Sequence, residues 1–140
     1  MGTVPATSAR GPSARDGGAA AVDFALVGAL LTLLFVSVLQ VALVVHVRNT
    51  LIDCAAEGAR WGARADRTAD DGARRTLELI SAELSPAYAG RLAGQVSADE
   101  VERAGVRVVQ VTVRAPLPVV ALVGPAGALS VRGHAFDERQ

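Results

Sequence analysis

Cysteine, lysine and net charge are what this sequence lacks or has least of. Its one cysteine, Cys54, cannot form a disulfide within the chain, and one thiol with two histidines gives no zinc-binding set at a recognised spacing. All 14 basic residues are arginines, and 14 acidic residues bring the formal net charge to +0. Without a basic excess the chain has no field to hold a polyanion. We therefore expect no disulfide scaffold, no metal site and no direct binding of nucleic acid.

The chain also has few of the features that an enzyme needs. Its 140 residues leave little room for a second, large catalytic domain. A catalytic nucleophile needs a base beside it, but His46 and Cys54 are separated by about 12 Å of rise along one predicted helix. His134 has no partner that the sequence makes evident. We therefore expect neither catalytic residues nor a cofactor.

Apolar residues are abundant, at 51% of the chain, and a long run of them lies near its beginning. The 24 residues from Phe24 to Val47 carry no charge. At about 1.5 Å per residue, this run is long enough to cross a bilayer core of about 30 Å. It is also longer than the apolar region of a cleaved secretory signal peptide. We predict one transmembrane helix over residues 19–47.

Residues 1–18 are rich in Gly, Pro, Ser and Thr without an apolar period, which predicts a disordered leader that processing could remove. Asp23 follows near the start of the helix and has two interpretations. As an N-cap, its carboxylate would accept backbone N–H groups at the helix start. Alternatively, the alanines at 19–21 extend the helix upstream, so that Asp16 is the better cap. Asp23 would then lie inside an apolar helix and need a cationic partner.

Beyond the apolar run, the pattern remains helical. Small and apolar residues recur at spacings of three and four from Leu51 to Gly62, which predicts that the helix continues as an amphipathic extension over residues 48–66. The remaining residues, 67–140, are predicted to form a small α+β domain. Its first element is a second amphipathic helix, with a capping box at residues 68–71 and a stop at Ser85-Pro86.

Several charged and small residues of these helices admit a plain structural role. Arg74 and Glu78 are spaced to pair on the exposed face of the second helix, as Glu57 and Arg60 are on the first. Trp61 is interpreted as an interface anchor or a lid on the sheet. The arginines from 60 to 75 alternate with aspartates and so predict a solvated face, not a phosphate groove. Two alanine rows are spaced for packing between subunits or result from composition alone: Ala21, Ala25 and Ala29, and Ala55, Ala59 and Ala63.

The last third of the sequence changes to a period of two. Val106 to Arg114 is a β-branched run that predicts a strand. Because Val106 and Val108 fall on the opposite parity from the later valines, a bulge near Val108 and burial of both faces both remain open. Further strands are predicted more weakly at Leu92–Ser97 and at Ala128–Phe136, with an edge segment or packing loop at Leu117–Val123. The fold class predicted is α+β, with a small antiparallel sheet packed on the helix.

Three segments together resemble the TadE-like (TadE/TadG) family, the minor pseudopilins of tight-adherence (Flp) type IV pilus systems. Residues 18–26, GAAAVDFAL, are similar to the family's glycine, small residues and Val-Glu-Phe-Ala, with Asp23 in place of the usual Glu. The segment AEGAR at 56–60, with Glu57, Gly58 and Arg60, is similar to the family's stretch just outside the membrane. The Val-rich strand and the Pro-containing apolar stretch after it resemble the family's C-terminal half. The resemblance is to actinobacterial-type members, and the composition is typical of a GC-rich genome.

The resemblance implies a pilin-like fold and a membrane-stored subunit or assembly factor of a Flp/Tad-type pilus. A prepilin peptidase would cut between Gly18 and Ala19 on the cytoplasmic face, which places the N-terminus inside and the C-terminal domain outside the membrane. Asp23, followed by Phe24, would then be the fifth residue and pair with a neighbouring subunit's N-terminus. The implied partners are the peptidase, other pilin or pseudopilin subunits, the assembly machinery and the bilayer. The alternative is an uncleaved single-pass envelope protein whose outer domain binds a partner.

Overall fold

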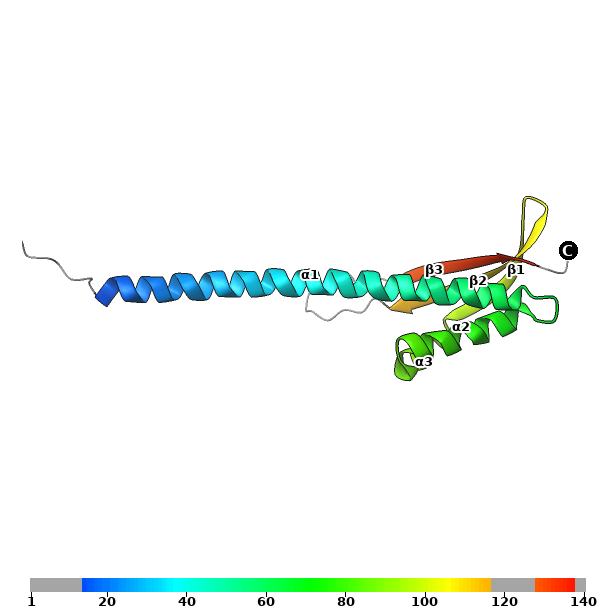
Figure 1. Ribbon diagram of the computed structural model, residues 1–140, viewed down its shortest axis with the longest axis horizontal. Coiled ribbons are helices and arrows are strands. Elements are labelled where there is room, and N and C mark those ends of the chain that lie inside the picture. Colours follow the sequence, from blue (N-terminus) through cyan, green and yellow to red (C-terminus); the bar gives the residue numbers. More distant parts are fainter. Residues whose placement is uncertain (1–13, 117–127, 138–140) are drawn as a thin grey trace, which may run out of the picture. The chain divides into compact units, whose positions relative to one another are not determined.

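The computed structural model describes residues 14–116 and 128–137 of the chain. The chain divides into two compact units, residues 1–39 and 40–140. The predicted α+β class is confirmed, since helices precede an antiparallel sheet (Figure 1). The elements are α1 (Ala14–Gly62), α2 (Ala69–Glu83), α3 (Pro86–Leu92), β1 (Val96–Arg103), β2 (Val106–Pro116) and β3 (Ala128–Phe136).

Helix α1 is unbroken over 49 residues and includes both the apolar run and the amphipathic extension. No proline interrupts it, and most of its residues are good helix formers. It begins at Ala14, so residues 14–18 are helical where the sequence pattern predicted a disordered leader. The alanines at 19–21 explain this difference, because they propagate the helix upstream. The rest of the predicted leader, residues 1–13, lies outside the described residues, and α1 ends at Gly62 instead of continuing to residue 66.

The three strands form one antiparallel sheet in the order β1-β2-β3, with β2 in the middle. Its register with β1 runs without a break from Val96 opposite Val113 to Arg103 opposite Val106. The strand therefore has no bulge near Val108, and burial of both faces explains the mixed parity. Val109, Val111 and Val113 are 0% exposed on one face, while Val108 and Thr112 on the other are 5% and 7% exposed.

Strand β1 differs most from its prediction. It begins at Val96 because Leu92, where the strand was expected to start, is the last residue of α3. It continues to Arg103 through a run of acidic residues that hides the apolar alternation in the sequence. A turn at Ala104 and Gly105, with φ of 53° and 79°, then leads into β2. Both values suit a two-residue hairpin loop. The predicted segment 117–123 lies outside the described residues.

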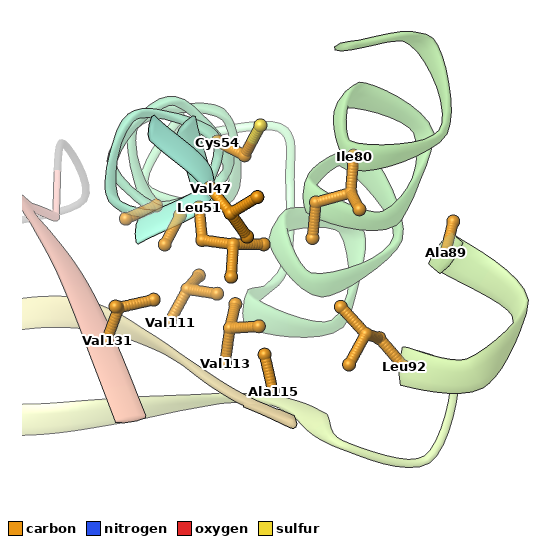
Figure 2. Close-up of a cluster of buried hydrophobic side chains, with 12 residues drawn as sticks. Val47, Leu51, Cys54, Ile80, Ala89, Leu92, Val111, Val113, Ala115 and Val131 are labelled. Carbon is orange, nitrogen blue, oxygen red and sulfur yellow. The ribbon is translucent and has the colours of Figure 1, made fainter. Parts of the chain in front are cut away.

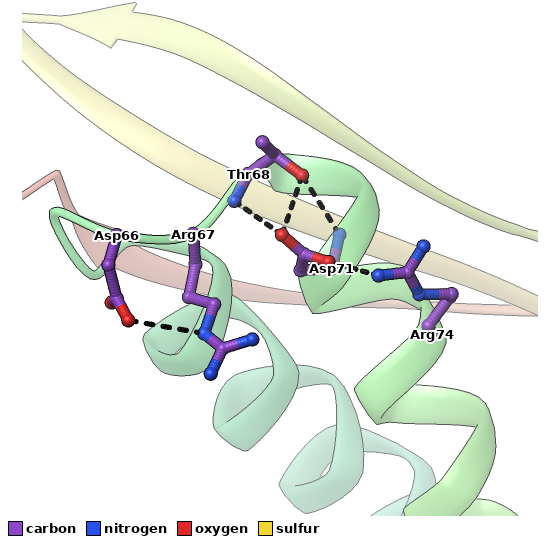
Figure 3. Close-up of polar contacts among 5 residues, drawn as sticks. All are labelled: Asp66, Arg67, Thr68, Asp71 and Arg74. Atoms are coloured by element: carbon purple, nitrogen blue, oxygen red, sulfur yellow. Dashed lines mark hydrogen bonds and ion pairs between the residues drawn. The ribbon is translucent and has the colours of Figure 1, made fainter.

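The second helix begins as its capping box predicts (Figure 3). The Thr68 hydroxyl accepts a hydrogen bond from the Asp71 backbone N–H at 3.3 Å, and the Asp71 carboxylate accepts one from the Thr68 backbone N–H at 2.9 Å. The expected pairing of Arg74 with Glu78 is wrong. Arg74 instead pairs with Asp71, whose carboxylate the cap already holds one turn earlier, and Arg75 pairs with Glu78 at 2.9 Å.

Helix α3 was not predicted, because Ser85-Pro86 was interpreted only as a stop signal. The same two residues also start a new helix. The Ser85 hydroxyl accepts a hydrogen bond from the Tyr88 backbone N–H at 3.1 Å, and Pro86 occupies the first turn, where a missing N–H costs nothing.

The core lies between the second half of α1, helices α2 and α3, and one face of the sheet (Figure 2). Leu51 of α1, Ile80 of α2 and Leu92 of α3 are each 0% exposed and meet the valines of β2. The predicted apolar face of the helix extension is thus confirmed. The second alanine row is buried as well, since Ala55, Ala59 and Ala63 are at most 2% exposed. These alanines pack within the chain and do not offer a surface to another subunit.

Three glycines bring α1 and α2 into backbone contact. A Cβ placed on Gly58 would lie 1.9 Å from the Thr76 hydroxyl oxygen and 2.7 Å from the Gly72 carbonyl oxygen. A Cβ on Gly62 would lie 2.9 Å from the Thr68 carbonyl oxygen, and one on Gly72 would lie 2.7 Å from the Gly58 carbonyl oxygen. The Thr76 hydroxyl donates to the Gly72 carbonyl at 2.9 Å and lies 3.4 Å from that of Cys54. Only glycine allows this approach.

Strand β3 meets α1 in the same way at one position. A Cβ on Gly133 would lie 2.3 Å from the backbone carbon of Ala55 and 2.4 Å from its carbonyl oxygen. Gly133 lies opposite Val111 in the sheet register. The strand therefore rests directly on the helix backbone at this point.

We expect Gly58→Ala to destabilise the unit of residues 40–140, because the new methyl group overlaps Thr76 and the Gly72 backbone. Overpacking of this kind typically costs about 1–3 kcal/mol. Thermal unfolding of the detergent-solubilised chain, followed by circular dichroism, measures the change.

Gly90→Ala in α3 is the matched control, because a Cβ there meets nothing within 4 Å. It should leave stability unchanged or raise it by up to about 1 kcal/mol, as expected for glycine replaced in an exposed helix. Equal unfolding midpoints for the two variants would contradict the close-contact interpretation.

The capping box predicts a dependence of stability on pH. The backbone N–H of Thr68, and then its hydroxyl, hold the pKa of Asp71 below its usual value of 3.8. The unfolded chain therefore binds the proton more tightly, so this stabilisation is present above about pH 4 and is lost as pH falls through the folded pKa. Asp71→Asn should flatten the decline in unfolding midpoint between about pH 5 and pH 2. Asp70→Asn, in the same helical turn, is the control and should keep the wild-type decline.

Candidate functional site

The first unit exposes a continuous apolar surface on α1. Phe24 is 82% exposed, Leu30 is 65% exposed and Phe35 is 67% exposed. Among the described residues, α1 is one helix long and apolar enough to cross a membrane, and its most apolar window is 0% buried. A core helix of a globular protein would bury such a surface. This exposure fits the solvent of a lipid bilayer and is consistent with single-pass membrane anchoring.

The hydroxyl groups within this apolar surface are satisfied by the helix itself. Thr32 donates to the Gly28 carbonyl oxygen at 2.8 Å, and Ser37 donates to that of Leu33 at 2.7 Å. An unsatisfied hydroxyl in hydrocarbon would be costly, so internal bonding is what a lipid-facing segment requires. The weakly polar residues that interrupt the run therefore do not argue against a membrane span.

Asp23 lies inside α1 and is exposed. Its N-cap interpretation is wrong for the full chain, because the helix starts at Ala14 and the nearby backbone N–H groups belong to helical turns. Asp16, the alternative cap, also lies within the first helical turn. The one charged residue of the sequence between residues 18 and 47 is thus Asp23, and it stands on an apolar helix.

The predicted processing residues lie one turn before Asp23, and both are exposed on α1. A Cβ on Gly18 would meet no atom within 4 Å. Packing within the described chain therefore does not require glycine at this position, in contrast to Gly58. Phe24 follows Asp23 and is the most exposed of the large apolar side chains on this helix.

The three residues of the segment outside the apolar run have separate roles. Gly58 is buried at the α1–α2 contact, so its role is architectural. Glu57 and Arg60 form an ion pair at 2.9 Å with side chains 50% and 66% exposed. Such a pair supports the helix by a few tenths of a kcal/mol, about what surface pairs contribute. The segment therefore joins α1 to α2 through Gly58.

Trp61 lies among arginines. Three guanidinium carbons lie 4.9 to 5.5 Å from its ring centroid, those of Arg64, Arg67 and Arg75. The ring also borders a hollow of about 650 Å³ with His134 and the 74%-exposed Phe136 of β3. The structure shows neither of the two predicted roles, an interface anchor or a lid on the sheet. Instead, the indole ring packs against arginine side chains. The nearby arginines also form ion pairs, which agrees with the predicted solvated face of mixed charge. These pairs are Arg67 with Asp66, Arg74 with Asp71 and Arg75 with Glu78.

Cys54 and His134, which were considered as catalytic groups, each make contacts within the fold. Cys54 is 4% exposed within the core. His134 does have a partner, since its Nε2–H donates to the Gln110 side-chain oxygen at 2.9 Å across the sheet. Partial burial, together with the charges of Arg103 and Arg132, lowers the pKa of His134. Among the described residues, no three His, Cys, Asp or Glu side chains are placed to hold a metal ion.

The residues of α2 and β3 that contact the backbone of α1 were not identified from the sequence. These are Gly72 and Thr76 on α2 and Gly133 on β3. A glycine in a predicted helix or strand interior is a known signal for close backbone approach, so two of the three could have been identified. The signal does not say which element approaches.

Comparison with known proteins adds one finding. The family model for TadE-like protein matches residues 18–60. No curated protein and no solved structure matches the chain. The matched segment begins at Gly18, contains Asp23 and the whole apolar surface, and ends at Arg60 beside the α1–α2 contact. Over residues 18–60, the chain is similar to TadE-like protein, and this segment includes most of the long hydrophobic helix α1.

Proposed function

We propose that this chain is a minor pseudopilin of a Flp/Tad-type pilus, stored in the cytoplasmic membrane and used as a subunit or assembly factor. The observation that carries the proposal is the position of Asp23, which is exposed, carries the one charge between residues 18 and 47 of α1, and lies inside the TadE-like match. A carboxylate in such a helix costs about 2.5–3.5 kcal/mol at the bilayer centre and less near the interface. A cationic partner would offset that cost.

Cleavage after Gly18 supplies such a partner. It creates an N-terminal ammonium group at Ala19 and makes Asp23 the fifth residue of the mature chain. One helical turn separates the two groups, so the amine of one copy and the carboxylate of a neighbour lie at similar depths. The exposed position of Gly18, where packing does not demand glycine, is consistent with a sequence requirement of a peptidase. The peptidase and the other pilus subunits are the partners, with the N-terminus inside and residues 67–140 outside the membrane.

The second candidate is an uncleaved envelope protein anchored by the same helix. One observation favours it. Helix α1 runs through Gly18 and Ala19 without interruption, so a peptidase would have to unwind the first turns to reach the bond. The state of the N-terminus therefore separates the two functions.

Under the first proposal, the protein extracted from membranes of its native host should begin at Ala19. Deletion of the prepilin peptidase should restore the full-length mass. Intact-mass measurement and N-terminal sequencing give the result directly. A full-length chain in both strains would overturn processing and favour the anchored envelope protein.

Asp23→Ala should leave membrane insertion intact and reduce filament assembly about tenfold or more, as expected for loss of one buried charge pair. Immunoblots of the membrane and sheared-filament fractions measure the two effects. Asp23→Glu should retain assembly, because it keeps the charge. Asp16→Ala should have no effect, because that residue lies before the cut. Normal assembly of the Asp23→Ala variant would show that the carboxylate has no role in it.

A further inference from the structure

A basic groove lies on one side of α1. It has a volume of about 430 Å³ and is lined by Arg48, Ile52, Ser130, Val131 and Arg132. Both arginines are exposed, and neither forms an ion pair with another described residue. None of the described residues that line the groove is acidic. The lining therefore combines the apolar side chains of Ile52 and Val131 with the positive charges of two arginines.

An acidic groove lies between α1 and α2. It has a volume of about 300 Å³ and is lined by Thr50, Asp53, Cys54, Glu57, Leu79 and Glu83. Glu57 is paired with Arg60, but Asp53 and Glu83 are exposed and form no ion pair within residues 14–116 and 128–137. This groove also combines apolar and charged groups, with the opposite sign.

The two grooves flank the same stretch of α1 from opposite sides. At about 3.6 residues per turn, the nine positions that separate Glu57 from Arg48 make about two and a half turns, which places the two side chains on opposite sides of the helix. The core face, with Leu51 and Ala55, lies between them on the remaining side. Within residues 40–140, the grooves are therefore at the same level along α1 and point away from each other.

Two copies of the chain can bring these grooves together. A single apolar helix holds every copy in the membrane with the same orientation, so the α1 helices of neighbours run parallel. Side by side, the acidic groove of one copy then faces the basic groove of the next. Opposite charges that meet at a partly desolvated contact attract more strongly than they do in water, and the apolar side chains that line the two grooves add buried area.

We propose that the acidic groove, with Asp53 and Glu83, docks against the basic groove, with Arg48 and Arg132, of a second copy of this chain in the same membrane. The contact joins two different surfaces, so a row of any length keeps one acidic groove free at one end and one basic groove free at the other. Such a contact closes into a ring or continues as a row. The inference goes beyond the proposed function, because it depends on membrane insertion but on neither cleavage at Gly18 nor pairing by Asp23.

An anionic lipid headgroup is the competing occupant of the basic groove, since Arg48 directly follows the apolar run. A headgroup would account for the two arginines only. It would leave Asp53 and Glu83 without a counter-charge and would repel them at an anionic surface. A second copy accounts for both grooves, and this favours the contact between chains.

The test uses the full chain, labelled with a donor or an acceptor fluorophore at its C-terminal end and reconstituted in phosphatidylcholine vesicles, which carry no net headgroup charge. Energy transfer as a function of the protein-to-lipid ratio gives the apparent association constant. For the wild type, we expect transfer above that of randomly distributed labels, and a decrease as salt is raised.

Charge reversal separates the possible outcomes. Glu83→Arg and Arg132→Glu should each weaken association about tenfold or more, and the double variant should return it to within about threefold of the wild type, because the charges are again complementary. A second set, Asp53→Arg and Arg48→Glu, serves if either variant of the first set fails to fold by circular dichroism. Asp99→Arg on β1, an exposed residue that lines neither groove, is the control and should change nothing.

Three results would overturn the contact between copies. These are a wild type that transfers no more energy than random labels, a double variant no better than the single ones, and association that requires added anionic lipid. The last would instead assign the basic groove to a headgroup. Loss of filaments in the Asp23→Ala variant together with any of these results would leave the proposed function standing. Conversely, confirmed association of a chain that is never cut at its N-terminus would support the contact between copies and overturn processing at Gly18.

Discussion

The backbone contact between α1 and α2 is the constraint on which the rest of the second unit depends. Gly58 and Gly72 leave no room for a Cβ, and the Thr76 hydroxyl is held between the two helices by carbonyl oxygens from both. With α2 fixed in this way, its apolar face reaches the sheet, and Ile80 becomes part of the core. Gly133 then lets β3 rest on the other side of the same stretch of helix. A long helix is thus held to a small domain with few large side chains and no disulfide.

The two halves of α1 have different surroundings. The second half turns one face, with Leu51 and Ala55, to the core. In the first half, the large apolar side chains that the structure describes are exposed, and the hydroxyl groups of Thr32 and Ser37 are bonded within the helix. A lipid bilayer favours both properties, because its hydrocarbon core solvates apolar side chains and offers no hydrogen-bond partners. Asp23 is the exception, because its carboxylate is charged. This is the physical reason to propose a partner for it.

The close contact also changes how the TadE-like match is understood. Residues 18–60 include two different features, an exposed segment with Gly18 and Asp23 at one end and a packing glycine, Gly58, at the other. Gly58 acts within the chain, whereas Gly18 packs against nothing that the structure describes. The two glycines are alike in sequence and different in role. Between the segments, the flanks of α1 carry charges of opposite sign that the fold itself does not neutralise.

The sequence by itself determined the features that depend on neighbouring residues: the apolar run, the amphipathic extension, the capping box at Thr68 and the central strand at Val106–Arg114. Each is a local pattern, so hydrophobic period and capping chemistry were enough to predict it. Local patterns did not identify α3, the true span of β1 or the ion pairs of Arg74 and Arg75, because competing local signals overlap there. Only the tertiary structure decided that Gly58 meets Gly72, that Gly133 meets Ala55 and that the second alanine row is buried. These are contacts between residues far apart in the chain, and a glycine or alanine carries no mark of its partner.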